Sequence, residues 1–336
     1  MSQDDKKDAL KANLLEFEQQ TRTTEKGPEN EKELTLAQRF KTVFGLAYMP
    51  IFGSLFHPIY TMVNAAVLGR EGTDQLAGFG LGSLTLGIMV ISIQSSFSFG
   101  ASTFISQAYG AGDLESCAIY RNRQCFLNAC MFLLLLIPQL FIHDIYIAIG
   151  QNPEIAIYAT QYVHTVLPGI FFYSQSQPYA SFSSSQRVTW YTMASTITGT
   201  AVHALLVWHF YGHLGWGFTG ICWATTFMWF TRFAVNFGLV TFGGRFKSYD
   251  NVKLFSRQTV SLLPQQIIMG LKSMSMSLWG WWAFDIFTLM ASYLATEIIA
   301  AQTVMRSIGL LTFMLPVGFA SACGTLVGNS VGQGNF

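Results

Sequence analysis

The sequence has 336 residues, of which 51% are hydrophobic and 11% charged, and its formal net charge is +1 at pH 7. Soluble domains carry about 25% charged residues, so this composition indicates a membrane protein. A net charge this close to zero argues against nucleic-acid binding as a main activity.

The N-terminal tail, residues 1–41, holds close to half of all the charged residues. It is polar, carries both signs of charge and has no early apolar core, so it is not a signal peptide. We expect a cytosolic tail that is disordered or weakly helical.

Eight apolar segments follow the tail. A helix needs about 20 mostly apolar residues to cross a bilayer, and each segment reaches that length. We predict spans at residues 43–68, 75–99, 125–149, 155–181, 191–211, 216–242, 273–293 and 298–327. The sequence therefore predicts an all-α, multi-pass integral protein of the lipid bilayer, in the plasma membrane or an endomembrane.

The loops between the predicted spans differ in their basic content. The loops after spans two, four and six are assigned Arg121, Arg123, Arg187, Arg245, Lys247, Lys253 and Arg257. The loops after the odd-numbered spans carry essentially only Arg70. The positive-inside rule then predicts that the N-terminus and the even-numbered loops lie in the cytosol.

One stretch of sequence occurs twice, at an offset of about 222 residues. The first copy begins at Thr73 and ends at Asp113, and the second begins at Thr296 and ends at Asn335. Each copy has an acidic residue before an apolar segment and closes with G-x-G followed by Asp or Asn. A repeat of this kind indicates two lobes of like orientation.

The repeat and the loop lengths predict four regions. Residues 1–41 form the cytosolic tail, and residues 42–242 form a first lobe of six spans. Residues 243–272 are assigned to a cytosolic linker, and residues 273–336 to a partial second lobe with spans seven and eight. A complete second lobe would need four more spans.

Asp285 is the first candidate for chemistry. It lies near the middle of span seven, in Trp279-Gly-Trp-Trp-Ala-Phe-Asp285, and an ionisable side chain inside a membrane is a functional candidate. Apolar aromatic neighbours disfavour the charged form of a carboxyl, so the group can take up and release a proton. The indoles of Trp279 and Trp282 are suited to holding an organic cation by cation–π contact. The alternative is a structural ion pair between Asp285 and Arg306.

Further polar side chains inside or close to the predicted spans are candidates for lining a substrate cavity. They are Asn64, Gln94, Gln186, His203, Gln302 and Arg306, together with the two indoles. Buried amides more often hold helices together than bind a ligand. His203 is either a proton relay or a core histidine, and Arg306 either faces the cavity or extends to the membrane surface.

The sequence offers no nucleophile triad and no spacing of metal ligands. Its five cysteines, Cys117, Cys125, Cys130, Cys222 and Cys323, form no C-x-x-C pair. We therefore predict neither an enzyme nor a bound cofactor.

Several motifs, taken in order, resemble those of the multidrug and toxin extrusion (MATE) family, in its eukaryotic branch. The loop at residues 68–77 is similar to the family's G-x-x-G-x-x-x-L-A, and residues 106–112 are similar to its S-Q-x-Y-G-A-G. Residues 167–169 followed by Gln186 fit its fourth span, and residues 316–320 and 327–332 fit its eighth. The resemblance covers roughly residues 35–336.

The resemblance implies twelve spans in two lobes, a central cavity and antiport of organic cations or other small organic solutes, driven by a proton or sodium gradient. Asp285 stands in place of the second glutamate of an E-W-W-x-aromatic-E signature, and Gly280 stands in place of the first. Asn64 stands where bacterial members carry Asp, and His203 replaces a common Asn. These departures put the usual coupling arrangement and a first-lobe cation site of the bacterial kind in doubt.

We expect a MATE-like helical bundle with a complete six-helix first lobe and the first two helices of a second, eight of an expected twelve spans. The preferred function is proton-coupled efflux of small organic solutes, xenobiotics included. Two alternatives remain open: a flippase of lipid-linked substrates, and a truncated membrane protein that does not transport or that depends on a partner for the missing spans.

Overall fold

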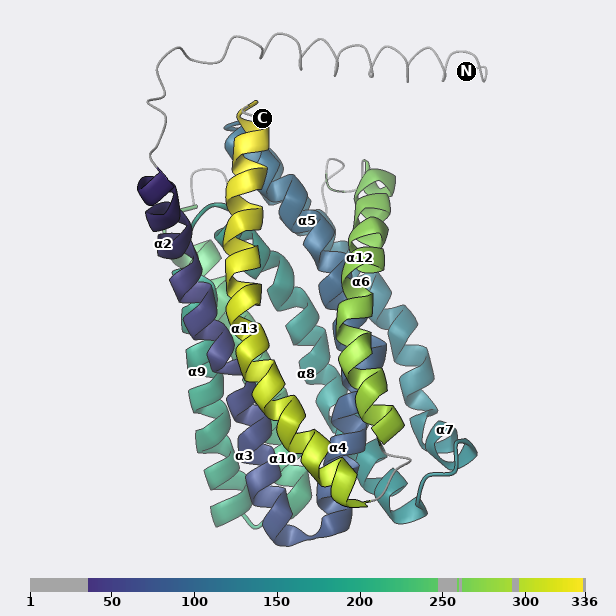
Figure 1. The fold of residues 1–336 in the computed structure, drawn as a ribbon. Coiled ribbons are helices and arrows are strands. Elements are labelled where there is room, and N and C mark those ends of the chain that lie inside the picture. The colour runs from purple at the N-terminus through teal and green to yellow at the C-terminus, as the bar shows by residue number, and fades with distance from the viewer. Residues whose placement is uncertain (1–35, 247–258, 260–261, 292–295, 335–336) are drawn as a thin grey trace, which may run out of the picture.

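The structure is a computed structural model that describes residues 36–246, 259, 262–291 and 296–334. Every element in these residues is a helix, as the sequence predicts. The helices stand roughly side by side in one bundle, and the first turns of α2 lie at the same end of the bundle as the last turns of α13 (Figure 1).

The first two spans are both interrupted. Span one consists of α2 (Leu36–Leu55) and α3 (His57–Glu71), which separate at Phe56 because Pro58 lacks an amide hydrogen and fits the first turn of a new helix. Span two consists of α4 (Thr73–Leu86), a π-helical turn η1 (Gly87–Ile91) and α5 (Ser92–Gly110).

The rest of the first lobe is formed by long helices that pack on one another. They are α6 (Leu114–Leu140), α7 (Ile142–Ala148), α8 (Pro153–Ser185), α9 (Trp190–Val207), η2 (Trp208–His213) and α10 (Gly217–Phe242). Helix α8 lies at the centre of the lobe and contacts α4, α5, α6 and α10. We refer to α2–α10 as the first lobe.

Two long helices lie in front of the first lobe (Figure 1). Helix α12 (Leu263–Ala291) packs against α5, and α13 (Thr296–Gly332) packs against α2 and α5. These two helices therefore meet the lobe along spans one and two.

Helices lie at all eight predicted segments. By length and hydropathy, five helical stretches among the described residues are able to cross a membrane: Phe40–Glu71, Thr73–Gly110, Leu114–Leu140, Pro153–Ser185 and Thr312–Gly332. Several helices are longer than predicted. Helix α12 begins at Leu263, within the range assigned to the linker, because Pro264 is compatible with a first helical turn.

The assignment of Arg121 and Arg123 to a loop is wrong. Both lie in α6, which begins at Leu114 after Asp113 accepts a hydrogen bond from the Ser116 amide. Arg121 is buried with its guanidinium 4.8 Å from the centre of the Phe182 ring. Aromatic faces and carbonyl groups satisfy these cations, so charge alone does not end the helix.

Close contact between α4 and α8 follows from the glycine spacing. A Cβ atom on Gly82 would lie 2.9 Å from Cδ1 of Tyr162, and one on Gly78 would lie closer still to Cβ of Tyr158. Gly80, between them, has no neighbouring atom within 4 Å of a Cβ position. The two glycines that face α8 therefore allow the two helices to pack closely.

Candidate functional site

Helix α12 meets span two at the π-helical turn η1. The indole N–H of Trp282 lies 3.2 Å from Ser92 Oγ and 3.4 Å from the Ile88 carbonyl oxygen, and the Ser92 hydroxyl donates to the same carbonyl at 2.7 Å. A π-turn leaves carbonyls with altered partners and is frequent at functional sites. The interruption in span two thus provides the acceptors that hold α12.

Four other predicted site residues lie on α12 and α13, and the structure describes the side chain of one of them, Trp279. The Trp279 ring is 66% exposed, and its centre lies 6.1 Å from that of Trp282. Asp285 follows Trp282 by one turn of α12, while Gln302 and Arg306 lie in α13. The side chains of Asp285, Gln302 and Arg306 lie outside the described residues, so the predicted ion pair stays a prediction.

The other predicted candidates lie in three separate places. Asn64 is buried inside the first lobe, where its Nδ2 donates to Thr225 Oγ1 at 3.2 Å. Gln94 is fully buried in α5, and neither amide atom has a hydrogen-bond partner among the described residues. Gln186 caps the end of α8 and donates to the Phe182 carbonyl at 3.1 Å.

His203 belongs to a cluster of rings inside the first lobe. It is fully buried, and its ring centre lies 5.8 Å from that of Tyr60. Tyr60 in turn contacts Trp229 at 5.8 Å, and Trp229 contacts Tyr173 at 4.6 Å. This arrangement joins α3, α8, α9 and α10, so His203 is a central residue of the lobe.

The ring cluster ends at a cation that our sequence analysis overlooked. The guanidinium of Arg232 lies 4.8 Å from the centre of the Trp229 ring and donates to Thr196 Oγ1 at 2.9 Å. Arg232 lies well inside the predicted span 216–242. It should have been found by the rule that selected Asp285, because any ionisable side chain at membrane depth is a functional candidate.

A chain of buried amides connects α12 to the first lobe. Gln266 donates to Gln124 Oε1 at 2.9 Å, and Gln124 donates to Asn128 Oδ1 at 2.8 Å. Asn128 then donates to the Ser174 carbonyl at 2.7 Å. This series of hydrogen bonds joins α12, α6 and α8, and it stabilises the contacts between these helices, as expected of buried amides.

The ends of the two repeat copies also meet. With its amide oriented to suit its neighbours, Asn329 on α13 donates to the Ser106 carbonyl at 2.8 Å and to the Ser185 carbonyl at 3.2 Å, and accepts from Arg187 Nε at 3.1 Å. A Cβ on Gly110 would lie only 2.8 Å from the Asn329 carbonyl carbon. We call these contacts the end junction. It holds α13 against the first lobe at one end of the bundle.

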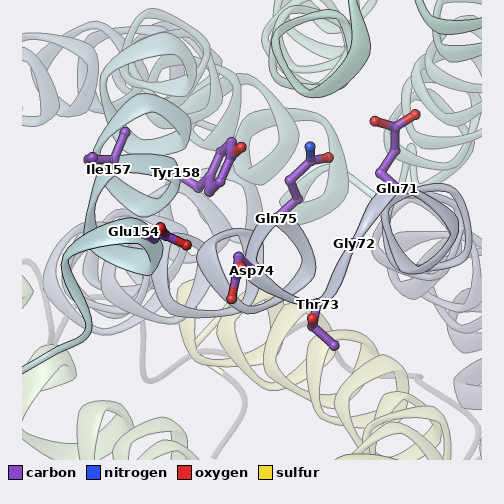
Figure 2. A pocket seen from close by; sticks show the side chains of 8 residues that line it. All are labelled: Glu71, Gly72, Thr73, Asp74, Gln75, Glu154, Ile157 and Tyr158. Atoms are coloured by element: carbon purple, nitrogen blue, oxygen red, sulfur yellow. The ribbon is translucent and has the colours of Figure 1, made fainter.

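An open acidic pocket lies at the opposite end of the bundle, where α3 turns into α4 (Figure 2). Its volume is about 500 Å³, and its lining includes the carboxylates Glu71, Asp74 and Glu154 from three helices (Figure 2). Tyr211 donates to Glu71 Oε1 at 2.6 Å. None of the lining residues is basic, so this pocket attracts cations from solution.

These features define an integral, multi-pass helical membrane protein whose last two described helices dock on an interrupted span. Among the described residues, no group of three or more His, Cys, Asp or Glu side chains is arranged to hold a metal ion.

Comparisons with known proteins show which family this chain resembles. The MatE family model matches residues 50–209. The chain is 28% identical over 277 residues to Protein DETOXIFICATION 1 of Arabidopsis thaliana. This alignment covers 82% of this chain and 58% of the relative. It is 26% identical over 292 residues to Multidrug and toxin extrusion protein 1 of Danio rerio, covering 85% and 48%. The chain is therefore similar to MATE family proteins, and it spans about half the length of these relatives.

Solved structures share the fold. The eukaryotic MATE transporter AtDTX14 superposes with a TM-score of 0.82 at 20% identity, covering 89% of this chain and 67% of that one. A transporter of the MOP superfamily from Pyrococcus furiosus superposes with a TM-score of 0.75 at 19% identity, covering 91% and 69%.

Proposed function

We propose that this chain acts in a secondary active transporter that exchanges protons for organic cations or other small organic solutes. The names of its relatives, which refer to extrusion and detoxification, support this class of activity. The observation that carries the proposal is the docking of α12 on the π-helical turn of span two. It directs one face of α12 toward the first lobe, through the Trp282 indole.

Asp285 is the proposed coupling residue. It lies three residues after Trp282, and positions i and i+3 share a helix face, separated by about 4.5 Å along the axis. It is the one acidic residue near the middle of a predicted span. A protonated Asp285 is neutral and releases a bound organic cation, whereas the carboxylate attracts one. Protons and solute thus compete for one group, as antiport requires.

The end junction supports an alternating-access cycle. It holds the lobes together at the end where α13 finishes, so solute entry from that end requires these contacts to separate. We assign that end to the cytosol because the basic residues Arg187 and Arg245 lie there, whereas the acidic pocket faces the other side.

A proton is preferred to sodium as the coupling ion. Asn64, the polar group of span one, is uncharged and already donates to Thr225. A sodium site needs several oxygen ligands, and residues 155–249, which include α9 and α10, contain no Asp or Glu.

The proposal is tested with the purified full chain in proteoliposomes. A pH gradient should drive accumulation of a fluorescent organic cation, and a sodium gradient without a pH gradient should not. Asp285→Asn should reduce pH-driven uptake at least tenfold, because an amide carries no proton. Asp144→Asn, the same change at an exposed site, should leave uptake intact.

The outcomes separate the alternatives. Absence of uptake by the unmodified chain would favour a protein that does not transport alone, and would contradict the proposal. Uptake driven equally by sodium would overturn the proton assignment. Full pH-driven uptake by Asp285→Asn would remove Asp285 from the mechanism.

A further inference from the structure

We propose that the first lobe contains a binding site for a small inorganic anion, held by Arg232. This site is separate from the α12 docking site and independent of the proposed exchange. It is a cavity of about 40 Å³ between α8, α9 and α10, on whose wall Arg232 lies with Trp229 and Asn236.

The charge of Arg232 is not balanced by the residues around it. None of the nine residues that line the cavity is acidic. The sequence has no Asp or Glu from residue 155 to residue 249, and Glu154 lies in the first turn of α8, about 28 Å along the helix from the cavity residue Tyr173. Arg232 is partly buried, and an uncompensated charge with reduced access to water is energetically costly, so the site favours a counter-ion.

The arginine also has unused hydrogen-bond donors. A guanidinium has five N–H groups. Among the described residues, the hydrogen bond to Thr196 is the one contact from this fork to an oxygen acceptor. The remaining donors and the adjacent cavity together form a binding site for an anion.

A second polar side chain on the cavity wall, Asn236, has one amide atom without a hydrogen-bond partner among the described residues. Asn236 is 2% exposed and donates from Nδ2 to Ser176 Oγ at 2.8 Å, while its Oδ1 is buried with no donor among the described residues. In our proposal, a bound anion requires this amide to be turned, so that the Ser176 hydroxyl donates to Oδ1 and the N–H₂ group is free to donate to the anion.

The packing around Arg232 is adapted to its side chain. Gly199 on α9 lies against the aliphatic part of Arg232, where an added Cβ would be 3.1 Å from Cδ and closer still to Cγ. Trp229, 1% exposed, supports the guanidinium from one face. Absence of a side chain at position 199 therefore makes room for the arginine at this depth.

The size of the cavity selects the ligand. A water molecule needs about 10–15 Å³ measured in the same way, so 40 Å³ holds roughly three waters or one halide ion. An organic carboxylate such as benzoate, with its ring, exceeds this space. The geometry thus favours an inorganic anion of the size of chloride.

Chloride binding is measured on the purified full chain in detergent micelles by the broadening of the ³⁵Cl resonance. The unmodified chain should broaden the line, and bromide but not benzoate should reverse the effect. Arg232→Gln should weaken binding about tenfold or more, since a hydrogen bond to a charged group contributes about 1.5–3 kcal/mol. Arg70→Gln, at an exposed arginine, should bind like the unmodified chain.

Gly199→Ala provides a second variant if Arg232→Gln is not monodisperse. It keeps the charge but displaces the arginine, so it should also weaken binding. No broadening by the unmodified chain, or equal broadening by a folded Arg232→Gln or Gly199→Ala variant, would overturn the proposal. Displacement of chloride by benzoate as effective as that by bromide would overturn the assignment to an inorganic anion.

Discussion

Replacing Asn329 by alanine removes the side chain that ties the end of α13 to the first lobe. The amide makes three hydrogen bonds across the end junction, two to carbonyls and one with Arg187. A neutral hydrogen bond contributes about 0.5–1.5 kcal/mol and one to a charged group about 1.5–3 kcal/mol. Allowing for non-additivity, we expect the closed arrangement to lose about 2–4 kcal/mol relative to the open one.

A loss of about 2 kcal/mol changes the ratio of closed to open molecules roughly 30-fold. The change is measured by the labelling rate of a cysteine placed at Ser106, which is 2% exposed and lies beneath Gly328. The exposed cysteines Cys130 and Cys323 are first replaced by serine. In this background, Asn329→Ala should raise the maleimide labelling rate at position 106 by roughly 30-fold or more.

The matched control is Ser330→Ala, next to Asn329 but exposed, which should leave the labelling rate unchanged. An unchanged labelling rate at position 106 in a folded Asn329→Ala protein would refute the claim that this residue stabilises the contact between α13 and the first lobe. An equal rise in the control would show that labelling reports general loosening of α13.

Two further predictions concern packing. Gly82→Ala should lower the free energy of unfolding by about 1–3 kcal/mol, because the added Cβ would overlap Tyr162. Gly80→Ala should leave the free energy of unfolding unchanged or raise it by up to about 1 kcal/mol. Similar losses for both variants would contradict the assigned helix face. The hydrogen bond between Gln266 and Gln124 is tested by a double-mutant cycle, measured by denaturant unfolding. Gln266→Ala and Gln124→Ala should show a coupling free energy of about 0.5–1.5 kcal/mol. Additive effects of the two substitutions would mean that this hydrogen bond does not hold α12 in place.

The fold was largely predictable because each membrane helix corresponds to a long apolar segment of the sequence. The predicted ends of spans four and six lie within four residues of the ends of α8 and α10. The π-helical turn at Gly87–Ile91 could not be predicted, since no proline or polar residue lies within it. The burial of Arg121 was missed for a related reason. Its partners, Tyr179 and Phe182, are some 60 residues away in sequence.

The candidate site was less predictable than the helices. Composition identifies polar residues at membrane depth, but it does not say which of them share a space. Trp282 meets span two, whereas His203 and Asn64 lie inside the first lobe and Gln186 lies at the end of α8. These groupings depend on helix rotation and on contacts between helices far apart in sequence, which one sequence does not encode in any local pattern.

The central claim is that Asp285 couples proton movement to solute movement. It is tested most directly by imposing a gradient of an organic cation across proteoliposomes at equal pH and recording luminal pH with a trapped dye. The unmodified chain and Asp144→Asn should move protons against the solute flow, and Asp285→Asn should not. Solute-driven proton movement of equal size in Asp285→Asn would contradict the claim.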